Sequence, residues 1–199
     1  MKKIIIVGLL SLLLKPFISF SSQGKAECTS VGPSGISGFW EILPKVKRIK
    51  HKKILCASSG CLATITKDFD IHYVYNLANF IKYENISNQR KKNDFIKIIT
   101  RQVEKIPDIS VVTMDFFGNC YKDVPRNKTH LMELLVETSD IPYFTTRNPG
   151  RRIDGGLCFY KFDDCITKIR SSFSFNVLLN LFNFNLSELE VMELYNYNI

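Results

Sequence analysis

The strongest structural constraint in this chain lies at residues 54–65, where a short apolar run passes through small residues into a second apolar run. The first run is too short for a helix and predicts a strand. Small residues between a strand and an apolar helix permit the sharp turn of a nucleophile elbow, usually written G-x-S-x-G. In that frame Ser58 is the nucleophile, Gly60 the closing glycine, and Cys56 replaces the opening glycine. A serine-rich turn without chemistry is the alternative, and this motif alone does not exclude it.

Composition fits one globular domain. The chain has 199 residues, of which 45% are hydrophobic and 23% charged, which excludes a disordered polymer. Its formal net charge of +8 favours an acidic partner, and both nucleic acid and anionic lipid qualify. The basic run at residues 45–53 is either a solvated face or a contact for lipid headgroups. No nucleic-acid motif accompanies the charge, so we expect no nucleic-acid partner.

The first 26 residues predict a signal peptide or signal-anchor. Lys2 and Lys3 precede an apolar run at residues 4–14, which is short for a membrane span. Gly24 and Ala26 are small residues at the two positions that a signal peptidase reads. An uncleaved anchor and a buried first strand are the alternatives. We therefore expect residues 27–199 to form one domain that is membrane-associated, in the secretory pathway or secreted.

Six cysteines follow this segment, an even number that fits disulfides in an oxidising compartment. Their spacing forms no paired C-x-x-C pattern, and we predict no metal site. Cys56 and Cys61 flank the elbow and are expected to be packed thiols.

A glycine-containing turn follows a short β-prone run at residues 28–31. Its residues are Gly32, Pro33, Ser34 and Gly35. Backbone N–H groups that converge at such a turn bind oxyanions. A phosphate-binding loop competes with this interpretation but lacks its lysine, and a plain turn is the third possibility.

A second glycine turn contains the candidate carboxylate. Asp154 ends a short extended run and is followed by Gly155 and Gly156, which let the backbone bend so that the carboxylate points into a cleft. A surface Asp-Gly hairpin is the competing interpretation.

Apolar spacing predicts the remaining elements. We expect a strand at residues 109–117 and helices at residues 36–43, 67–83, 94–106 and 130–137, with a polar loop at residues 84–94. The apolar segment at residues 172–199 predicts a helix that packs on the sheet or lies in a lipid interface.

The order of these motifs resembles the patatin-like phospholipase family, within it the adiponutrin-type lipid acyl hydrolases. Residues 56–64 are close to the family pattern G-A-S-A-G-A-L, and residues 138–144 are similar to A-S-x-x-I-P. Residues 153–157 match D-G-[GA], and residues 32–38 are similar to the glycine-rich oxyanion loop. The resemblance implies an α/β fold with a mostly parallel sheet flanked by helices.

The resemblance also implies a Ser–Asp dyad that cleaves carboxylic esters of glycerolipids at a membrane or lipid-droplet surface, without a cofactor or metal. Ser58 would attack the ester carbonyl, Asp154 would accept its proton, and the Gly32–Gly35 amides would hold the oxyanion. No histidine follows Asp154, as a dyad predicts. The alternative is a catalytically inactive patatin-like protein that binds lipid surfaces or a protein partner.

Overall fold

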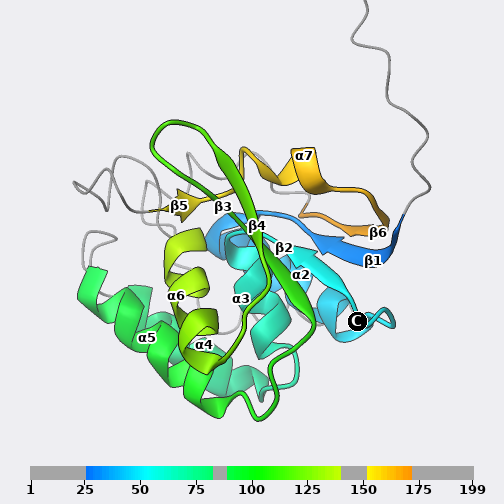
Figure 1. Ribbon diagram of the computed structural model, residues 1–199. Coiled ribbons are helices and arrows are strands. Elements are labelled where there is room, and N and C mark those ends of the chain that lie inside the picture. Colours follow the sequence, from blue (N-terminus) through cyan, green and yellow to red (C-terminus); the bar gives the residue numbers. More distant parts are fainter. Residues whose placement is uncertain (1–25, 83–88, 140–151, 172–199) are drawn as a thin grey trace, which may run out of the picture.

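The computed structural model describes residues 26–82, 89–139 and 152–171 (Figure 1). In these ranges the chain is an α/β structure with a six-stranded mixed sheet flanked by helices, which confirms the predicted class. The elements are β1 (Ala26–Val31), α2 (Gly35–Lys47), β2 (Ile54–Cys56), α3 (Ser59–Thr66), α4 (Ile71–Lys82), α5 (Gln89–Gln102), β3 (Ile109–Met114), β4 (Cys120–Asp123), α6 (Lys128–Thr138), β5 (Ile153–Asp154), α7 (Phe159–Phe162) and β6 (Cys165–Ile169).

The sheet is parallel in its middle and antiparallel at β4 and β5. Its main order is β4-β3-β2-β1-β6, and β5 pairs with β3 outside that path. Strands β1, β2, β3 and β6 run parallel, whereas β4 and β5 run antiparallel to β3. A mostly parallel sheet is therefore partly correct, since two of the six strands run the other way.

Hydrophobic side chains cover both faces of the sheet. Alternate residues of a strand point to opposite faces, so Ile54 and Cys56 join the larger core while Leu55 joins the smaller one. The larger core also contains buried residues of α2, α3, α4, α5 and α6. The smaller core packs around Phe159 of α7, which lies away from helices α3 to α6 in Figure 1. Burial on both faces explains why β2 and β3, in the middle of the sheet, are nearly continuous apolar runs.

Several elements differ from the sequence predictions. Helix α5 begins at Gln89, inside the expected polar loop, and ends at Gln102. Its first turn is rich in lysine and arginine, which are good helix formers without being apolar. Strands β4 and β6 and the single turn α7 were not predicted. Of the expected signal segment at residues 1–26, only Ala26 is described, as the first residue of β1, and the expected helix at residues 172–199 lies outside the described residues.

Three disulfides use all six cysteines: Cys28–Cys165, Cys56–Cys61 and Cys120–Cys158. The prediction of packed thiols at positions 56 and 61 is therefore wrong. The sharp turn between β2 and α3 brings their Cα atoms within 5.0 Å, a separation that a disulfide spans. In the described part of the chain no helix has the length and apolar character to cross a bilayer.

Candidate active site

The turn between β2 and α3 holds Ser58 in a strained backbone conformation. Its φ is 53° and its ψ is −137°, and in the three described ranges it is the only residue other than glycine with a positive φ. Such a conformation costs an L-residue free energy and persists only where the surroundings enforce it. Gly60 is part of that enforcement, because a Cβ there would lie 2.5 Å from the carbonyl oxygen of Val31. The strand–turn–helix that the sequence predicts at residues 54–65 is present, as β2 followed by α3.

Thr138, the last residue of α6, fastens the Ser58 backbone to the sheet. The Ser58 amide donates to the Thr138 Oγ1 at 2.8 Å. The Thr138 hydroxyl in turn donates to the carbonyl oxygen of Val112 in β3 at 3.0 Å, and Thr138 is fully buried. Because the hydroxyl serves as acceptor and donor at once, it links elbow, helix and strand in one chain of hydrogen bonds.

Strand pairing places Asp154 beside the elbow. Thr113 of β3 pairs with β4 along one edge of the strand. The same residue also pairs with Asp154 of β5. A strand has two edges, and β4 occupies one edge of β3. Strand β5 must therefore pair along the other edge, where β2 pairs with β3 up to Cys56 and Val111. Strand β2 ends there and turns away at Ser58. Asp154 therefore takes up the stretch of β3 that β2 leaves, next to the start of the elbow.

The two glycines after Asp154 fit the turn into tight space. A Cβ at Gly155 would lie 2.3 Å from the carbonyl oxygen of Val112, the same oxygen that accepts from Thr138. The Gly156 N–H donates to Asp154 Oδ1 at 2.7 Å. A Cβ at Gly156 would lie 3.4 Å from Pro33, so this turn packs against the glycine-containing turn. Three motifs far apart in the sequence thus meet at the carboxyl end of the parallel strands.

Some of the amides expected to hold an oxyanion are already bonded. The Gly32 N–H donates to the carbonyl oxygen of Ile169 at 3.1 Å, and Pro33 has no N–H. The Ser34 N–H donates to Ser59 Oγ at 3.0 Å, and the hydroxyl oxygens of these two buried serines are 2.8 Å apart. These bonds lock the glycine-containing turn onto the first residue of α3.

Two other amides of these turns begin helices. Gly35 is the first residue of α2 and Ser59 the first residue of α3. The first N–H groups of a helix have no partner within the helix and carry its partial positive charge. Sequence reasoning missed Ser59, although the residue after an elbow nucleophile commonly supplies such an N–H.

Two groups of the hairpin between β3 and β4 have perturbed pKa values, the Asp115 carboxyl and the Tyr121 hydroxyl. A hydrogen bond from the Asn119 side chain is the main reason why the pKa of Asp115 lies below its ordinary value. A hydrogen bond to Asp115 raises the pKa of Tyr121. Two of the three histidines have partners elsewhere: His51 Nε2 lies 3.2 Å from Thr167 Oγ1, and His130 Nδ1 accepts the Arg126 N–H.

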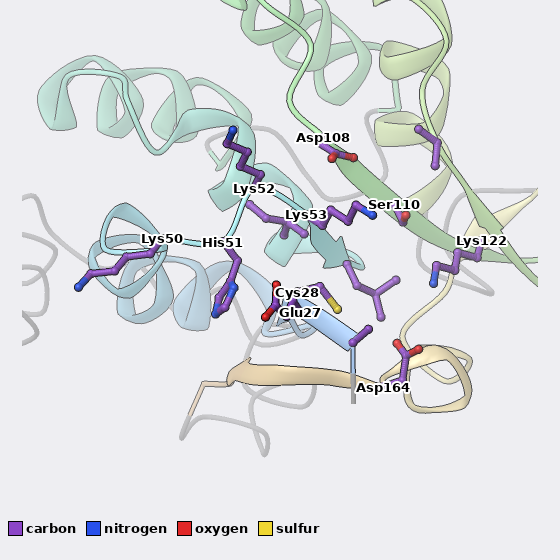
Figure 2. Close-up of a pocket in the computed structure, with 14 residues that line it drawn as sticks. Glu27, Cys28, Lys50, His51, Lys52, Lys53, Asp108, Ser110, Lys122 and Asp164 are labelled. Carbon is purple, nitrogen blue, oxygen red and sulfur yellow. The ribbon is translucent and has the colours of Figure 1, made fainter. Parts of the chain in front are cut away.

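A separate hollow of about 820 Å³, which we call the amino-edge pocket, lies where the parallel strands begin (Figure 2). It contains none of the predicted site residues. Ammonium and carboxylate groups line it together, so their charges largely offset one another. These charged residues are Lys50, Lys52, Lys53, Lys122, Glu27, Asp108 and Asp164.

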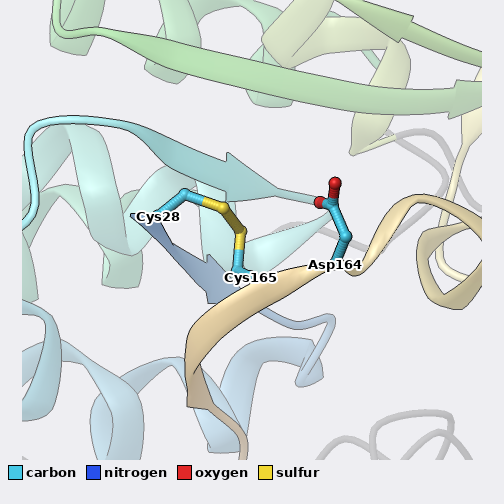
Figure 3. A group of neighbouring side chains, drawn as sticks. All are labelled: Cys28, Asp164 and Cys165. Atoms are coloured by element: carbon cyan, nitrogen blue, oxygen red, sulfur yellow. A yellow bond between two sulfur atoms is a disulfide. The ribbon is translucent and has the colours of Figure 1, made fainter. Parts of the chain in front are cut away.

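Within the described residues, one group has the composition of a metal site, namely Cys28, Asp164 and Cys165 (Figure 3). The two sulfur atoms are bonded to each other. A disulfide offers no thiolate to a metal, and a single exposed carboxylate remains, so this group does not form a metal centre.

A comparison with known protein families finds no family model that matches the chain, and no curated protein matches it either.

Proposed function

We propose that the chain is a patatin-like serine lipid acyl hydrolase, of the phospholipase A or triacylglycerol lipase type, that cleaves carboxylic esters of glycerolipids. The observation that carries this proposal is the positive φ of Ser58 at the junction of β2 and α3. Strain of this kind gathers at functional sites, and a nucleophile elbow needs it to expose the serine hydroxyl. The neighbouring position of Asp154 supplies a base of the right type.

In this mechanism Ser58 Oγ attacks the ester carbonyl carbon while the Asp154 carboxylate takes its proton, directly or through water. The leaving alcohol receives that proton when the ester bond breaks, and an acyl-enzyme on Ser58 remains. Water then attacks the acyl group, again with Asp154 as the base, and releases the fatty acid. The Ser59 and Gly35 N–H groups would stabilise the oxyanion, at about 3 kcal/mol for each donor.

The three disulfides support the proposed location in the secretory pathway or outside the cell. Disulfides persist in oxidising compartments and are rare where glutathione keeps thiols reduced. Cys28–Cys165 and Cys120–Cys158 connect segments 137 and 38 residues apart in sequence. Their formation depends on the fold as well as on the compartment.

A specific observation favours a second candidate, a catalytically inactive relative that binds lipid surfaces or a protein partner. The Gly32 and Ser34 N–H groups, which the resemblance assigns to the oxyanion, donate to Ile169 and Ser59 instead. If the Gly35 and Ser59 amides do not replace them, the tetrahedral intermediate is left without stabilisation.

The full chain with its disulfides formed separates the two candidates. Release of fatty acid from phospholipid vesicles and from triacylglycerol emulsions should fall to background in Ser58→Ala and in Asp154→Asn. Ser110→Ala, in the amino-edge pocket, is the matched control and should keep the wild-type rate. Hydrolysis that survives in either site variant contradicts the dyad. An inert wild-type protein supports the second candidate.

A further inference from the structure

Large apolar side chains are exposed in the hairpin between β3 and β4 and in the segment that follows Asp154. In the described part of the chain, seven such residues are exposed, and four of them belong to two short segments. Phe117 is 82% exposed and Leu157 is 80% exposed. We call these four residues the apolar rim: Phe116, Phe117, Leu157 and Tyr160.

The hairpin between β3 and β4 is built to present its two phenylalanines. The Asp115 carboxylate accepts the backbone N–H groups of Phe117 and Asn119, the Asn119 side-chain amide and the Tyr121 hydroxyl. Gly118 follows with a φ of 82°, a conformation that favours glycine. An ordered turn therefore holds the apolar side chain of Phe117 in solvent, at a position where a polar side chain would fit without burying any polar group.

A disulfide joins this hairpin to the segment that follows Asp154. Cys120 begins β4, three residues after Phe117, and it is bonded to Cys158, the neighbour of Leu157. The two Cα atoms are 5.5 Å apart. In Figure 1 the hairpin, β5 and α7 all lie in the upper part of the view. The bridge thus keeps both halves of the apolar rim together, a few residues from the candidate carboxylate.

We propose that the apolar rim inserts into the surface of a bilayer that contains anionic lipid. This inference rests on the proposed function, because it names the surface through which that site reaches an aggregated substrate. Aromatic and leucine side chains at loop tips match the boundary between headgroups and acyl chains. The net charge of +8, with Lys161 exposed beside Tyr160, complements an anionic membrane.

A tryptophan introduced into the rim tests the insertion directly. The chain has one tryptophan, Trp40, which is buried and contributes equally to every variant. Phe117→Trp reports on the rim, and Val124→Trp reports on an exposed apolar position at the amino-edge pocket. Both are made in a full-length Ser58→Ala background, so vesicle lipid stays intact. The vesicles contain phosphatidylcholine and phosphatidylglycerol with brominated acyl chains.

We expect the fluorescence of the Phe117→Trp protein to shift to the blue and to be quenched by bromine, while that of the Val124→Trp protein stays unchanged. Protein that cosediments with vesicles without quenching at position 117, or that does not cosediment, overturns the proposal. Failure of membrane insertion is distinct from failure of the proposed function. The proposed function is tested by whether Ser58 hydrolyses a soluble ester. Phe117→Ser with Leu157→Ser should slow hydrolysis of vesicle lipid about tenfold and leave hydrolysis of a soluble short-chain ester unchanged.

Discussion

The two ends of the parallel strands differ in what shapes them. At the carboxyl end, backbone carbonyls leave no room for a Cβ at Gly60 or Gly155, and Ser58 is held at positive φ. At the amino end the amino-edge pocket is large, with charges of both signs from exposed side chains. None of the described residues that line this pocket has a positive φ, whereas enforced strain at a serine needs a reason. Backbone strain at Ser58, together with glycines that cannot be replaced by a larger residue, therefore locates the candidate site better than the volume of a pocket does.

Removing disulfides should give the largest effects on stability, and it should separate the two ends. The loop closed by Cys28–Cys165 is long and that closed by Cys56–Cys61 is short. From loop entropy, the paired Cys28→Ala and Cys165→Ala exchange should lower the free energy of unfolding by about 5 kcal/mol, against about 2 kcal/mol for Cys56→Ala with Cys61→Ala. Urea denaturation measures both, and a reversed order would contradict the pairing.

Gly60→Ala tests whether the elbow is as tight as described. Its Cβ would lie 2.5 Å and 2.6 Å from the carbonyl oxygens of Val31 and Gly32, so the backbone must shift. We expect a loss of about 3 kcal/mol in the free energy of unfolding, together with loss of hydrolysis. Gly118→Ala is the control: it meets no neighbouring atom and should cost about 1 kcal/mol, from its φ alone. Equal costs at the two positions would mean that the elbow is not closely packed.

Thr138→Val keeps the shape of the side chain and removes the hydroxyl. The part-buried Ser58 N–H then loses its acceptor, which should lower the free energy of unfolding by about 1 kcal/mol in thermal or urea denaturation. Thr138→Ser restores the hydroxyl and should recover most of the esterase rate. If the valine variant hydrolyses esters as fast as the serine variant, the hydrogen bond does not position the nucleophile.

Among these predictions acid should have the smallest effect, and we expect it at the hairpin of the apolar rim. The pKa of Asp115 lies below its ordinary value of 3.8, chiefly because of the Asn119 side chain. The stabilisation that the ionised Asp115 carboxylate gives the hairpin is therefore complete above pH 3.8. It is lost as the pH falls through the lowered pKa. Amide NMR signals of Phe117 and Asn119 should move only in this acid range. Asp115→Asn should remove the transition, and a transition near neutral pH would assign it to another group.

The sequence predicted the turns that only small residues can form, because the steric requirement there is local. The small residues of the elbow and the glycines after Asp154 predicted turns that the structure contains. It failed where the partner is distant: Thr138 lies 80 residues from Ser58, and nothing local marks its hydroxyl as the acceptor. Strand β4 was missed because its residues are only partly buried and polar, so they carry no apolar period.

Phosphonylation of the native full-length chain tests the central claim most directly. A fluorophosphonate reacts with a serine only where a base and an oxyanion site activate it. Mass spectrometry should find one adduct, on Ser58, forming at least about a hundredfold more slowly in Asp154→Asn. An unlabelled Ser58, or a Ser58 labelled equally fast without the Asp154 carboxylate, would contradict the account.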